Sequence, residues 1–386
     1  MTTETTALAT HYQTDFADFE GVAYLNAALQ GPMPLVAARE AQAALEWKMH
    51  PYRLPDSAYF DLPDRIRDKI ARVIGGRPSE VAVTTGASAG LGALAAGMDW
   101  KPGDEVLVGR GEFPAHFSTW LRYEQAGRLR VRVIEPRDRF ISADDYIDSI
   151  GPHTRLISAS LVRFDNGARL DALRVARACE EVGAALVLDL SQCAGAMTLN
   201  IRDLGASMAV SSGYKWLLGP YGSGFFWIAE EWIDLLPLGA VYFMALEGAR
   251  EFHALPSGNL RVAPGARRWD SAETANFTNL AAFDSSLEMI LRIGTHAIQS
   301  SIDALVKEII DGLPGTNCVL TSPAERERRG PYVCVSARNP EHTAALYEKL
   351  RTAKISVSLR ENALRIAPHI YNTPDDISRL MKILSE

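Results

Sequence analysis

Apolar and polar residues between positions 81 and 228 follow a regular order, in which short apolar runs alternate with longer amphipathic stretches. The short runs are typical of buried strands and lie at 81–84, 104–109, 129–135, 154–162, 184–191, 206–212 and 224–229. The stretch 171–183 has apolar residues at helical spacing and ends at Gly183, so it predicts a helix. Strands separated by helices predict a doubly wound α/β fold with a mostly parallel sheet and right-handed crossovers.

The pattern changes after residue 246. Long helical stretches occupy 275–313, and apolar runs that predict strands follow at 330–338 and 354–368. A closing helix is predicted over 373–384, because Thr373 can cap it and a proline follows in its first turn. These patterns predict three parts, namely an N-terminal arm (1–20), a large α/β domain (21–246) and a smaller α+β C-terminal domain (247–386).

Composition narrows the class of protein. The chain has 386 residues, of which 47% are hydrophobic and 23% are charged, which is ordinary for a globular protein. Its formal net charge of -7 offers no basic patch for nucleic acid, and no apolar run approaches the ~18 residues of a membrane helix. The N-terminus has no secretory signal. The four cysteines are scattered without a CxxC pair, so we expect them to pack as apolar side chains in a cytoplasmic protein without nucleic-acid or membrane partners.

A glycine-containing turn follows the first predicted strand. The residues 84–92 read "TTGASAGLG", which resembles the nucleotide-binding turn of short-chain dehydrogenases. A dinucleotide fingerprint belongs on the first strand of its fold, far earlier than here, and no tyrosine is followed by a lysine four residues later. What remains is a strand that leads into a helix N-terminus, whose N–H groups and dipole favour a phosphate. We therefore interpret this turn as a phosphate-binding turn.

Asp189 ends one apolar strand, and Lys215 lies at the end of another. The carboxyl ends of parallel strands carry the ligands of α/β sheets. Lys215 lies between Tyr214 and Trp216, and partial desolvation by these rings would lower its pKa toward the range of a nucleophilic amine. A phosphate-binding turn, an aspartate for a pyridinium proton and a lysine for an aldehyde are together the parts that a pyridoxal phosphate site needs.

The segments "DLSQ" (189–192) and "SSGYKWLLGPYGSGF" (211–225) resemble the class V aminotransferase family of fold-type I pyridoxal phosphate enzymes. This family includes cysteine desulfurases, kynureninase and isopenicillin N epimerase-like proteins. The resemblance spans nearly the whole chain, from "YLNAALQGPMP" (24–34) to "LRIAPHIYNT" (364–373). It implies the fold-type I architecture and the cofactor pyridoxal 5'-phosphate.

The resemblance also implies a role for each matching residue around the cofactor ring. Lys215 would hold the cofactor as a Schiff base and move the substrate's α-proton, Asp189 would pair with the pyridine nitrogen, and Gln192 would approach the ring hydroxyl. The segment "RGEFPAHFSTW" (110–120) matches the segment whose residue after the glutamate stacks on the ring. Here that residue is Phe113, where desulfurases have a histidine, and a flat apolar face suits stacking.

For the phosphate, the resemblance implies contacts from Ala87, Ser88, Ser212 and Tyr214. The segment 267–277 is similar to the one that reaches a neighbouring subunit's phosphate, with Thr274 and Asn276 as its candidates, so a homodimer with shared active sites is expected. Arg365 would bind the substrate α-carboxylate through its guanidinium fork, and Asn26 would lie near the substrate entrance. No metal site is predicted.

The sequence departs from the family pattern in two places. Desulfurases carry a cysteine on the loop before the carboxylate-binding arginine, whereas 352–365 contains none. Arg163 and Phe164 stand where the family often has an asparagine near the ring hydroxyl. Cys193, directly after Gln192, is expected to pack in the core.

These features favour an enzyme that acts on a small α-amino acid. Transamination is the first choice, because it needs nothing beyond the residues named. β-Elimination, including C–S lysis without a persulfide cysteine, and epimerisation stay open on the sequence. A catalytically idle cofactor- or partner-binding protein is the alternative of another class, and an oxidoreductase is disfavoured by the missing dehydrogenase residues.

Overall fold

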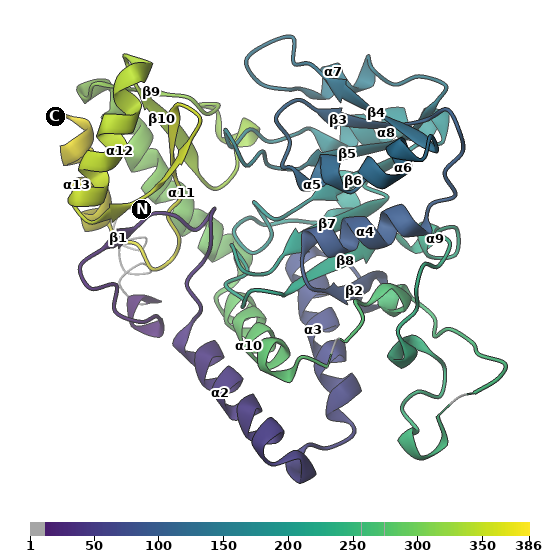
Figure 1. The fold of residues 1–386 in the computed structure, drawn as a ribbon. Helices are drawn as coiled ribbons and strands as arrows, with labels where there is room; N and C mark the ends of the chain where they lie inside the picture. The colour runs from purple at the N-terminus through teal and green to yellow at the C-terminus, as the bar shows by residue number, and fades with distance from the viewer. Residues whose placement is uncertain (1–11, 256, 274) are drawn as a thin grey trace.

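A computed structural model of the chain describes residues 12–255, 257–273 and 275–386 (Figure 1). Within these residues the largest sheet has seven strands in the order β2-β8-β7-β6-β5-β3-β4. The strands are β2 (Val81–Thr84), β3 (Asp104–Gly109), β4 (Leu129–Ile134), β5 (Thr154–Ser160), β6 (Ala185–Asp189), β7 (Met208–Ser212) and β8 (Gly224–Ile228). Strand β8 runs antiparallel to both of its neighbours, β2 and β7, and the other neighbouring strands of this sheet are parallel. The predicted mostly parallel α/β sheet is confirmed, and each predicted strand is present.

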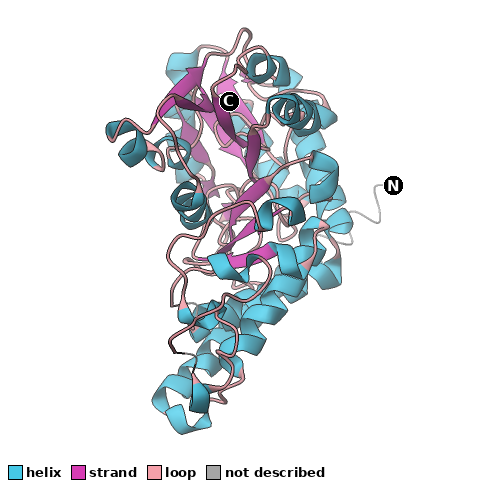
Figure 2. Cartoon of the chain, turned by 90° about the vertical axis from the view of Figure 1, so that its right-hand side faces the viewer, coloured by secondary structure: helices cyan, strands magenta, loops and turns pink. Residues whose placement is uncertain are grey.

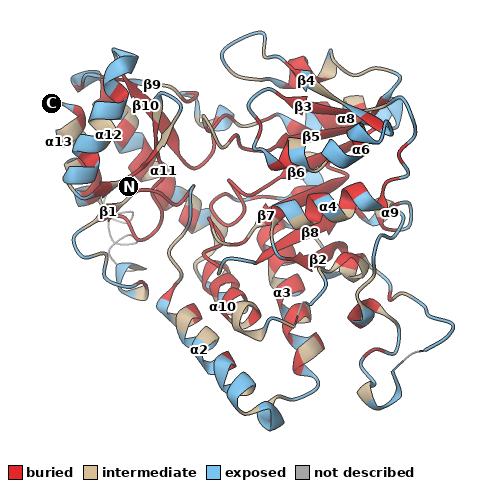
Figure 3. Cartoon of the chain, viewed as in Figure 1, coloured by how far each residue is buried: buried red, intermediate tan, exposed pale blue. Residues whose placement is uncertain are grey.

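Residues that alternate along the strands point into two separate cores. On β6, Leu186 and Leu188 belong to one core, whereas Val187 belongs to the other. Apolar residues in continuous runs therefore bury both faces of the sheet, as expected of parallel strands. Figure 2 shows the strands enclosed by helices, and Figure 3 shows most of them buried, whereas the edge strand β4 is partly exposed.

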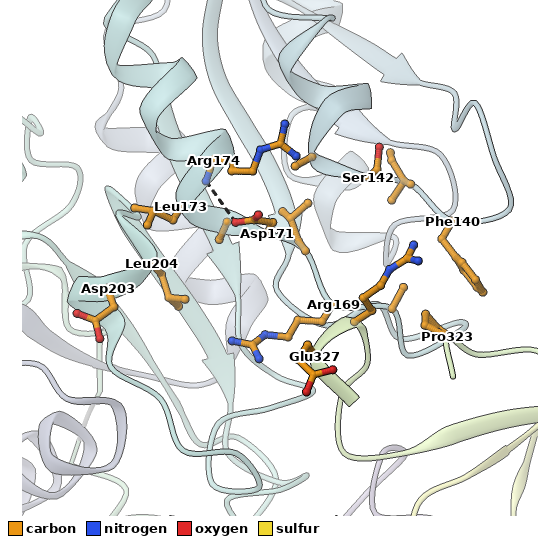
Figure 4. Close-up of a pocket in the computed structure, with 16 residues that line it drawn as sticks. Phe140, Ser142, Arg169, Asp171, Leu173, Arg174, Asp203, Leu204, Pro323 and Glu327 are labelled. Atoms are coloured by element: carbon orange, nitrogen blue, oxygen red, sulfur yellow. Dashed lines mark hydrogen bonds between the residues drawn. The ribbon is translucent and has the colours of Figure 1, made fainter. Parts of the chain in front are cut away.

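Helices cover each face of this sheet. The helices before and between its strands are α2 (Leu35–Met49), α3 (Ala58–Ile74), α4 (Ala87–Gly97), α5 (Ala115–Ser118), α6 (Leu121–Gln125), α7 (Ala143–Ile147) and α8 (Ala172–Val182), and α9 (Glu230–Ile233) follows β8. The core of one face includes α3 and α8, and the core of the other includes α4. Helix α8 matches the prediction, because the Asp171 carboxylate accepts a hydrogen bond from the Arg174 amide and Gly183 ends the helix with φ of 70° (Figure 4).

The C-terminal part contains a four-stranded antiparallel sheet, counted over the described residues, in the order β12-β13-β10-β9. Its strands are β9 (Cys318–Leu320), β10 (Val333–Ala337), β12 (Ser358–Arg360) and β13 (Ala363–Ile366). The helices of this part are α10 (Phe277–Ile293), α11 (Thr295–Gly312), α12 (Thr343–Thr352) and α13 (Pro374–Leu384). Helix α13 begins at the predicted cap, where Thr373 and Asp376 form a capping box.

The N-terminal segment is tied to the C-terminal part. Strand β1 (Ala23–Tyr24) pairs in parallel with β11 (Ile355–Ser356), and Asn26 forms a bridge with Ala367. Residues that the sequence assigned to the large domain therefore hydrogen-bond with the C-terminal strands. The division of the chain at residue 246 stays a prediction.

The strand register brings the ends of β2, β6 and β7 and the start of β8 to one edge of the large sheet. Asp189, at the end of β6, pairs with Val210 of β7, so the ends of these two parallel strands are adjacent. Ser212, at the end of β7, is opposite Gly224 of β8, which in turn is opposite Thr84 at the end of β2. Helix α4 starts directly after β2, so its N-terminus lies near the segment that carries Lys215. Among the described helices, none is long and apolar enough to cross a membrane.

Candidate active site

Lys215 and Asp189 line one small pocket at the ends of β6 and β7. Lys215 is 8% exposed and Asp189 is 7% exposed. The other residues that line the pocket are Phe113, Ser160, Val162, Phe164, Ser191 and Gln192. The two residues that the sequence singled out as the amine and the carboxylate are therefore brought together in a buried pocket lined by both apolar and polar side chains.

The buried position changes the chemistry of the Lys215 amine. Burial lowers the pKa of Lys215 from 10.5 to about 8, and the nearby Asp189 carboxylate opposes this effect without cancelling it. At pH 7 about one amine in ten is then uncharged, compared with fewer than one in a thousand for an ordinary lysine. Lys215 is therefore able to act as a nucleophile and a base near neutral pH.

Asp189 is held in its ionised form. Burial alone would raise the pKa of Asp189, but His116 and Lys215 bring it below its usual value, and Ser191 also hydrogen-bonds to the carboxylate. The Ser191 amide donates to Asp189 Oδ1 at 2.7 Å. An ionised and fixed carboxylate of this kind can hold a proton on a heterocyclic nitrogen.

A buried cluster of charged side chains lies next to Asp189. The sequence analysis did not predict this cluster. His116 Nε2 is 3.7 Å from Asp189 Oδ2 and 3.9 Å from Glu112 Oε2, and Nδ1 of the same ring is 2.8 Å from Ser158 Oγ. The two carboxylates raise the pKa of His116 above 6.5, although burial alone would lower it. The spacing of Glu112 and His116 (i, i+4) was a signal that could have indicated this pair.

Arg163 belongs to this cluster and not to the pocket. Its Nη1 lies 3.2 Å from Glu112 Oε1, its Nε donates to Asp165 at 3.2 Å, and its Nη2 donates to the Arg110 carbonyl at 2.9 Å. The neighbouring Phe164 does line the pocket, and its ring meets Phe113 edge-on at 5.3 Å. The guanidinium at the position of the family's asparagine is thus paired with Glu112 and Asp165, although its Nη1 has no hydrogen-bond partner.

Phe113 and Gln192 complete the walls around Lys215. The Lys215 Nζ lies 5.5 Å from the centre of the Phe113 ring, and this ring is 38% exposed. The Gln192 amide is fixed, because its Nε2 donates to the Ala28 carbonyl at 3.0 Å and its Oε1 accepts from Trp216 Nε1 at 2.9 Å. The amide nitrogen has a second hydrogen, so one donor remains for a ligand.

The phosphate-binding turn lies beside Ser212. Gly86 precedes α4 with φ of 148°, a conformation that favours glycine, and a side chain placed there would come within 3.8 Å of Ser212 Oγ. Of the two predicted residues at the start of α4, Ala87 is buried and Ser88 is exposed. Amides in the first turn of a helix have no acceptor within the helix. Tyr214 is partly buried and its ring packs on Tyr221, with centroids 5.2 Å apart.

Arg365 is a buried cation without an acidic partner. It is 2% exposed, its Nη1 donates to the Phe164 carbonyl at 2.8 Å, and its Nη2 is 3.5 Å from Ser358 Oγ. Its Nε has no hydrogen-bond partner, and no carboxylate in the described residues forms an ion pair with it. Asn26 is connected to this group, because its Oδ1 accepts from Ser358 Oγ at 2.6 Å. A buried guanidinium of this kind is costly unless an anion joins it.

Two residues were predicted to reach a neighbouring subunit. Thr274 lies outside the described residues, and Asn276 does not line this pocket. Asn276 is exposed and caps α10, where its Oδ1 accepts from the Asn279 amide at 3.4 Å. Its role toward a second subunit stays a prediction.

The cysteines offer no reactive thiol near Lys215. All four are free and buried. Burial raises the pKa of Cys334 to about 12 and raises that of Cys193 strongly. Such thiols stay protonated and unreactive at neutral pH. Among the described residues, His, Cys, Asp and Glu form no group that could hold a metal ion.

A cavity of about 580 Å³ lies elsewhere, between the start of α8 and the segment 323–328 (Figure 4). Its lining carries arginines together with Asp171, Asp203 and Glu327, so charges of both signs face it. It contains neither Lys215 nor Asp189. The candidate active site is therefore chosen by the environment of its titratable groups and not by the volume of the cavity.

Comparisons with known proteins agree with this geometry. The family model described as "Aminotransferase class-V" matches residues 57–380, so the chain belongs to this family. A kynureninase of Pseudomonas fluorescens is 26% identical over 100% of this chain and 95% of its own length. A probable cysteine desulfurase of Methanothermobacter thermautotrophicus is 25% identical over 76% of this chain and 74% of its own length.

A solved structure of a C-DES mutant, with glycine covalently linked to its pyridoxal phosphate cofactor, has a TM-score of 0.86. It is 20% identical in sequence, and the match covers 97% of this chain and 99% of that chain. The fold is therefore that of the fold-type I pyridoxal phosphate enzymes, as the resemblance implied. The family and these structures indicate pyridoxal 5'-phosphate as the cofactor.

The residues present fit this cofactor. The amine of Lys215 is buried and partly uncharged, the carboxylate of Asp189 is ionised, and the N-terminus of α4 lies at the same sheet edge. These are the three groups that an aldehyde, a pyridine nitrogen and a phosphate need.

Proposed function

We propose that the protein is a pyridoxal phosphate-dependent enzyme that transaminates a small α-amino acid, with Lys215 holding the cofactor covalently. The observation that carries this proposal is the pocket shared by Lys215 and Asp189, in which burial lowers the pKa of the amine to about 8. Arg365 supports it, because a buried guanidinium without an acidic partner suits a substrate carboxylate.

In this proposal each residue of the site has its own role in the reaction. When bound, the cofactor supplies an electron sink for the negative charge that forms at the substrate Cα. Arg365 binds the α-carboxylate, and the Lys215 amine accepts the Cα proton and returns it. Asp189 holds a proton on the ring nitrogen, and the Phe113 ring covers one side of the pocket against water. Ser88, Ser212 and Tyr214, with the α4 amides, bind the phosphate.

Transamination needs only these groups. Epimerisation by a two-base route needs a second base on the opposite face of Cα, and the described residues that line the pocket include no second amine or imidazole. β-Elimination is the second candidate. It is favoured over desulfuration by the four buried, free cysteines, since any C–S bond cleavage has to proceed without a reactive protein thiol.

The proposal includes a homodimer in the cytoplasm. Leu35, Leu45 and Met49 of α2 are exposed apolar side chains, and Tyr221 is exposed beside Tyr214. We expect a second copy to cover these side chains, and the shared site is proposed from the resemblance of the segment 267–277. The four free thiols are compatible with a reducing compartment.

Borohydride reduction of the cofactor-loaded protein tests the proposal. Peptide mapping should find the reduced adduct on Lys215, and a Lys215→Ala variant should show none. A panel of amino acids, assayed in parallel for keto acid, ammonia, sulfide and the inverted enantiomer, then separates the reactions. An adduct on another lysine would overturn the proposed site, and loaded protein without any product would favour a catalytically idle protein.

A further inference from the structure

A second arginine lies on the same strand face as Arg365. Strands β12 and β13 form an antiparallel pair in which Ser358 is opposite Arg365 and Arg360 is opposite Ala363. Side chains two residues apart on a strand share a face, and so do directly opposite residues on neighbouring strands. Ser358, Arg360, Ala363 and Arg365 therefore all belong to one face of this pair.

This face carries Arg365 and, through Ser358, contacts Asn26, the two residues that are expected to bind the substrate. Ser358 Oγ donates to Asn26 Oδ1 at 2.6 Å and lies 3.5 Å from Arg365 Nη2. Arg360 is one step further along the same face and has the small side chain of Ala363 opposite it. The alanine opposite Arg360 has no side-chain group that could pair with the guanidinium.

Arg360 also has no acidic partner. It is partly buried, and its Nη1 donates to the Leu359 carbonyl at 3.2 Å. No carboxylate forms an ion pair with it within the described residues. Two guanidiniums on one face thus lack a counter-charge from the protein.

The electrostatics of the pocket agree with this placement. Burial has the largest effect on the pKa of Lys215, and Arg365 and Arg360 both act to lower it further. Arg360 also contributes to the lowered pKa of Arg365, again after burial. Arg360 is therefore close enough to affect the pKa values of both Lys215 and Arg365. A single α-carboxylate would neutralise only one of the two arginines.

We propose that Arg360 binds a second anionic group on the substrate, so that the enzyme acts on an α-amino acid whose side chain ends in a carboxylate or a comparable anion. This inference rests on the proposed function and deepens it. Arg365 binds the α-carboxylate, and Arg360 binds the distal anion through a charge-assisted hydrogen bond. An exposed arginine without a ligand would give no such preference.

Carboxylic acids without an amino group test this binding in the absence of turnover. Calorimetry on the cofactor-loaded protein compares succinate with butyrate and glutarate with pentanoate, pairs of equal carbon number that differ in the second carboxylate. We expect the dicarboxylates to bind about ten- to a hundred-fold more tightly, as for a charge-assisted contact. Arg360→Gln should abolish this preference and leave the affinity for butyrate and pentanoate unchanged.

Two further variants keep the test decisive. Arg360→Lys retains the charge and should retain part of the preference. Arg155→Gln is the matched control, because Arg155 is exposed near the amino end of β5, away from the strand ends that form the pocket. It should bind like the unmodified protein. Thermal unfolding shows whether each variant is folded.

Equal binding of both acids in each pair, or a preference that survives in Arg360→Gln, would overturn the inference. The borohydride adduct on Lys215 is measured on the same samples. An adduct without a dicarboxylate preference rejects the role of Arg360 alone, whereas a missing adduct rejects the proposed function.

Discussion

His116 Nε2 lies 3.7 Å from Asp189 Oδ2, and the His116 side chain is fully buried. The other nitrogen of the ring is fixed by Ser158, so the imidazole cannot turn away from the carboxylate. Burial alone would raise the pKa of Asp189, and the nearby charge of His116 acts in the opposite direction and lowers it. We infer that His116 is a positioning residue that keeps Asp189 ionised where the cofactor nitrogen would bind.

Replacement of His116 by Gln should therefore change a pH profile as well as the rate. Without the imidazole, the pKa of Asp189 rises, and the carboxylate becomes protonated at a higher pH. The low-pH limit of cofactor binding, followed by absorbance of the loaded protein between pH 4 and 8, should move upward. A purely structural role would lower stability at every pH and leave this midpoint where it is.

The same cluster predicts how stability depends on pH. The pKa of His116 is raised above 6.5, so its contribution is complete below that value and is lost as pH rises through the raised pKa. The pKa values of Glu112 and Asp189 are lowered, so their contributions are complete above their usual values and are lost as pH falls through the lowered ones. Urea unfolding of the cofactor-free protein should show a larger deficit for His116→Gln at pH 6 than at pH 9. A deficit that grows with pH would contradict this.

The lowered pKa of Lys215 predicts the rate at which the cofactor-free protein captures an aldehyde. Only the uncharged amine reacts, so the rate should rise with pH, reach half of its maximum near pH 8 and level off above it. Stopped-flow absorbance with added pyridoxal phosphate measures this profile. A midpoint near 10.5 would show an ordinary, solvated amine.

Local patterns were enough to predict most of the large sheet, whereas long-range contacts were not visible in the sequence. Helix α8 is predictable because Asp171 and Gly183 are signals within the segment itself. The pairing of β1 with β11 joins Ala23 to Ile355, and neither short strand has a distinctive pattern. Pairing across such a separation depends on tertiary packing.

The same distinction holds within the candidate site. Asp189 and Lys215 lie at the ends of predicted strands, so their proximity could be predicted from the topology of the sheet. The orientation of the Arg163 side chain could not be predicted, because it depends on an ion pair with Glu112, which is distant in the sequence. The lack of a partner at Arg365 is likewise a property of the folded chain alone.

Sulfur chemistry gives a further test. Since residues 352–365 contain no cysteine and the four thiols are buried, free cysteine should not produce a persulfide on this protein. Mass spectrometry of the protein during incubation with cysteine would detect the added sulfur. Cys334→Ser should be as active as the unmodified protein. A persulfide on any cysteine would show that a buried thiol becomes accessible.

The proposed homodimer should be stable and should form shared sites. We expect an interface above ~2,000 Å² in total, as for obligate dimers. Light scattering should give twice the mass of 42.2 kDa. Because Asn276 is expected to reach the neighbouring phosphate, Asn276→Ala should weaken cofactor binding, while Asn317→Ala in the C-terminal part serves as the control. An active monomer would exclude shared sites.

Arg365 should determine which class of amine is a substrate. Its guanidinium is buried and has no acidic partner, so it can present two parallel donors to a carboxylate, a geometry that lysine cannot reproduce. We expect Arg365→Lys to keep cofactor binding and to lower kcat/KM for amino acids by about 2–3 kcal/mol, roughly thirty- to a hundred-fold. Amines without a carboxylate should be much less affected. Steady-state kinetics on an amino acid and on its decarboxylated amine provide the comparison, and equal losses for both would remove Arg365 from substrate binding.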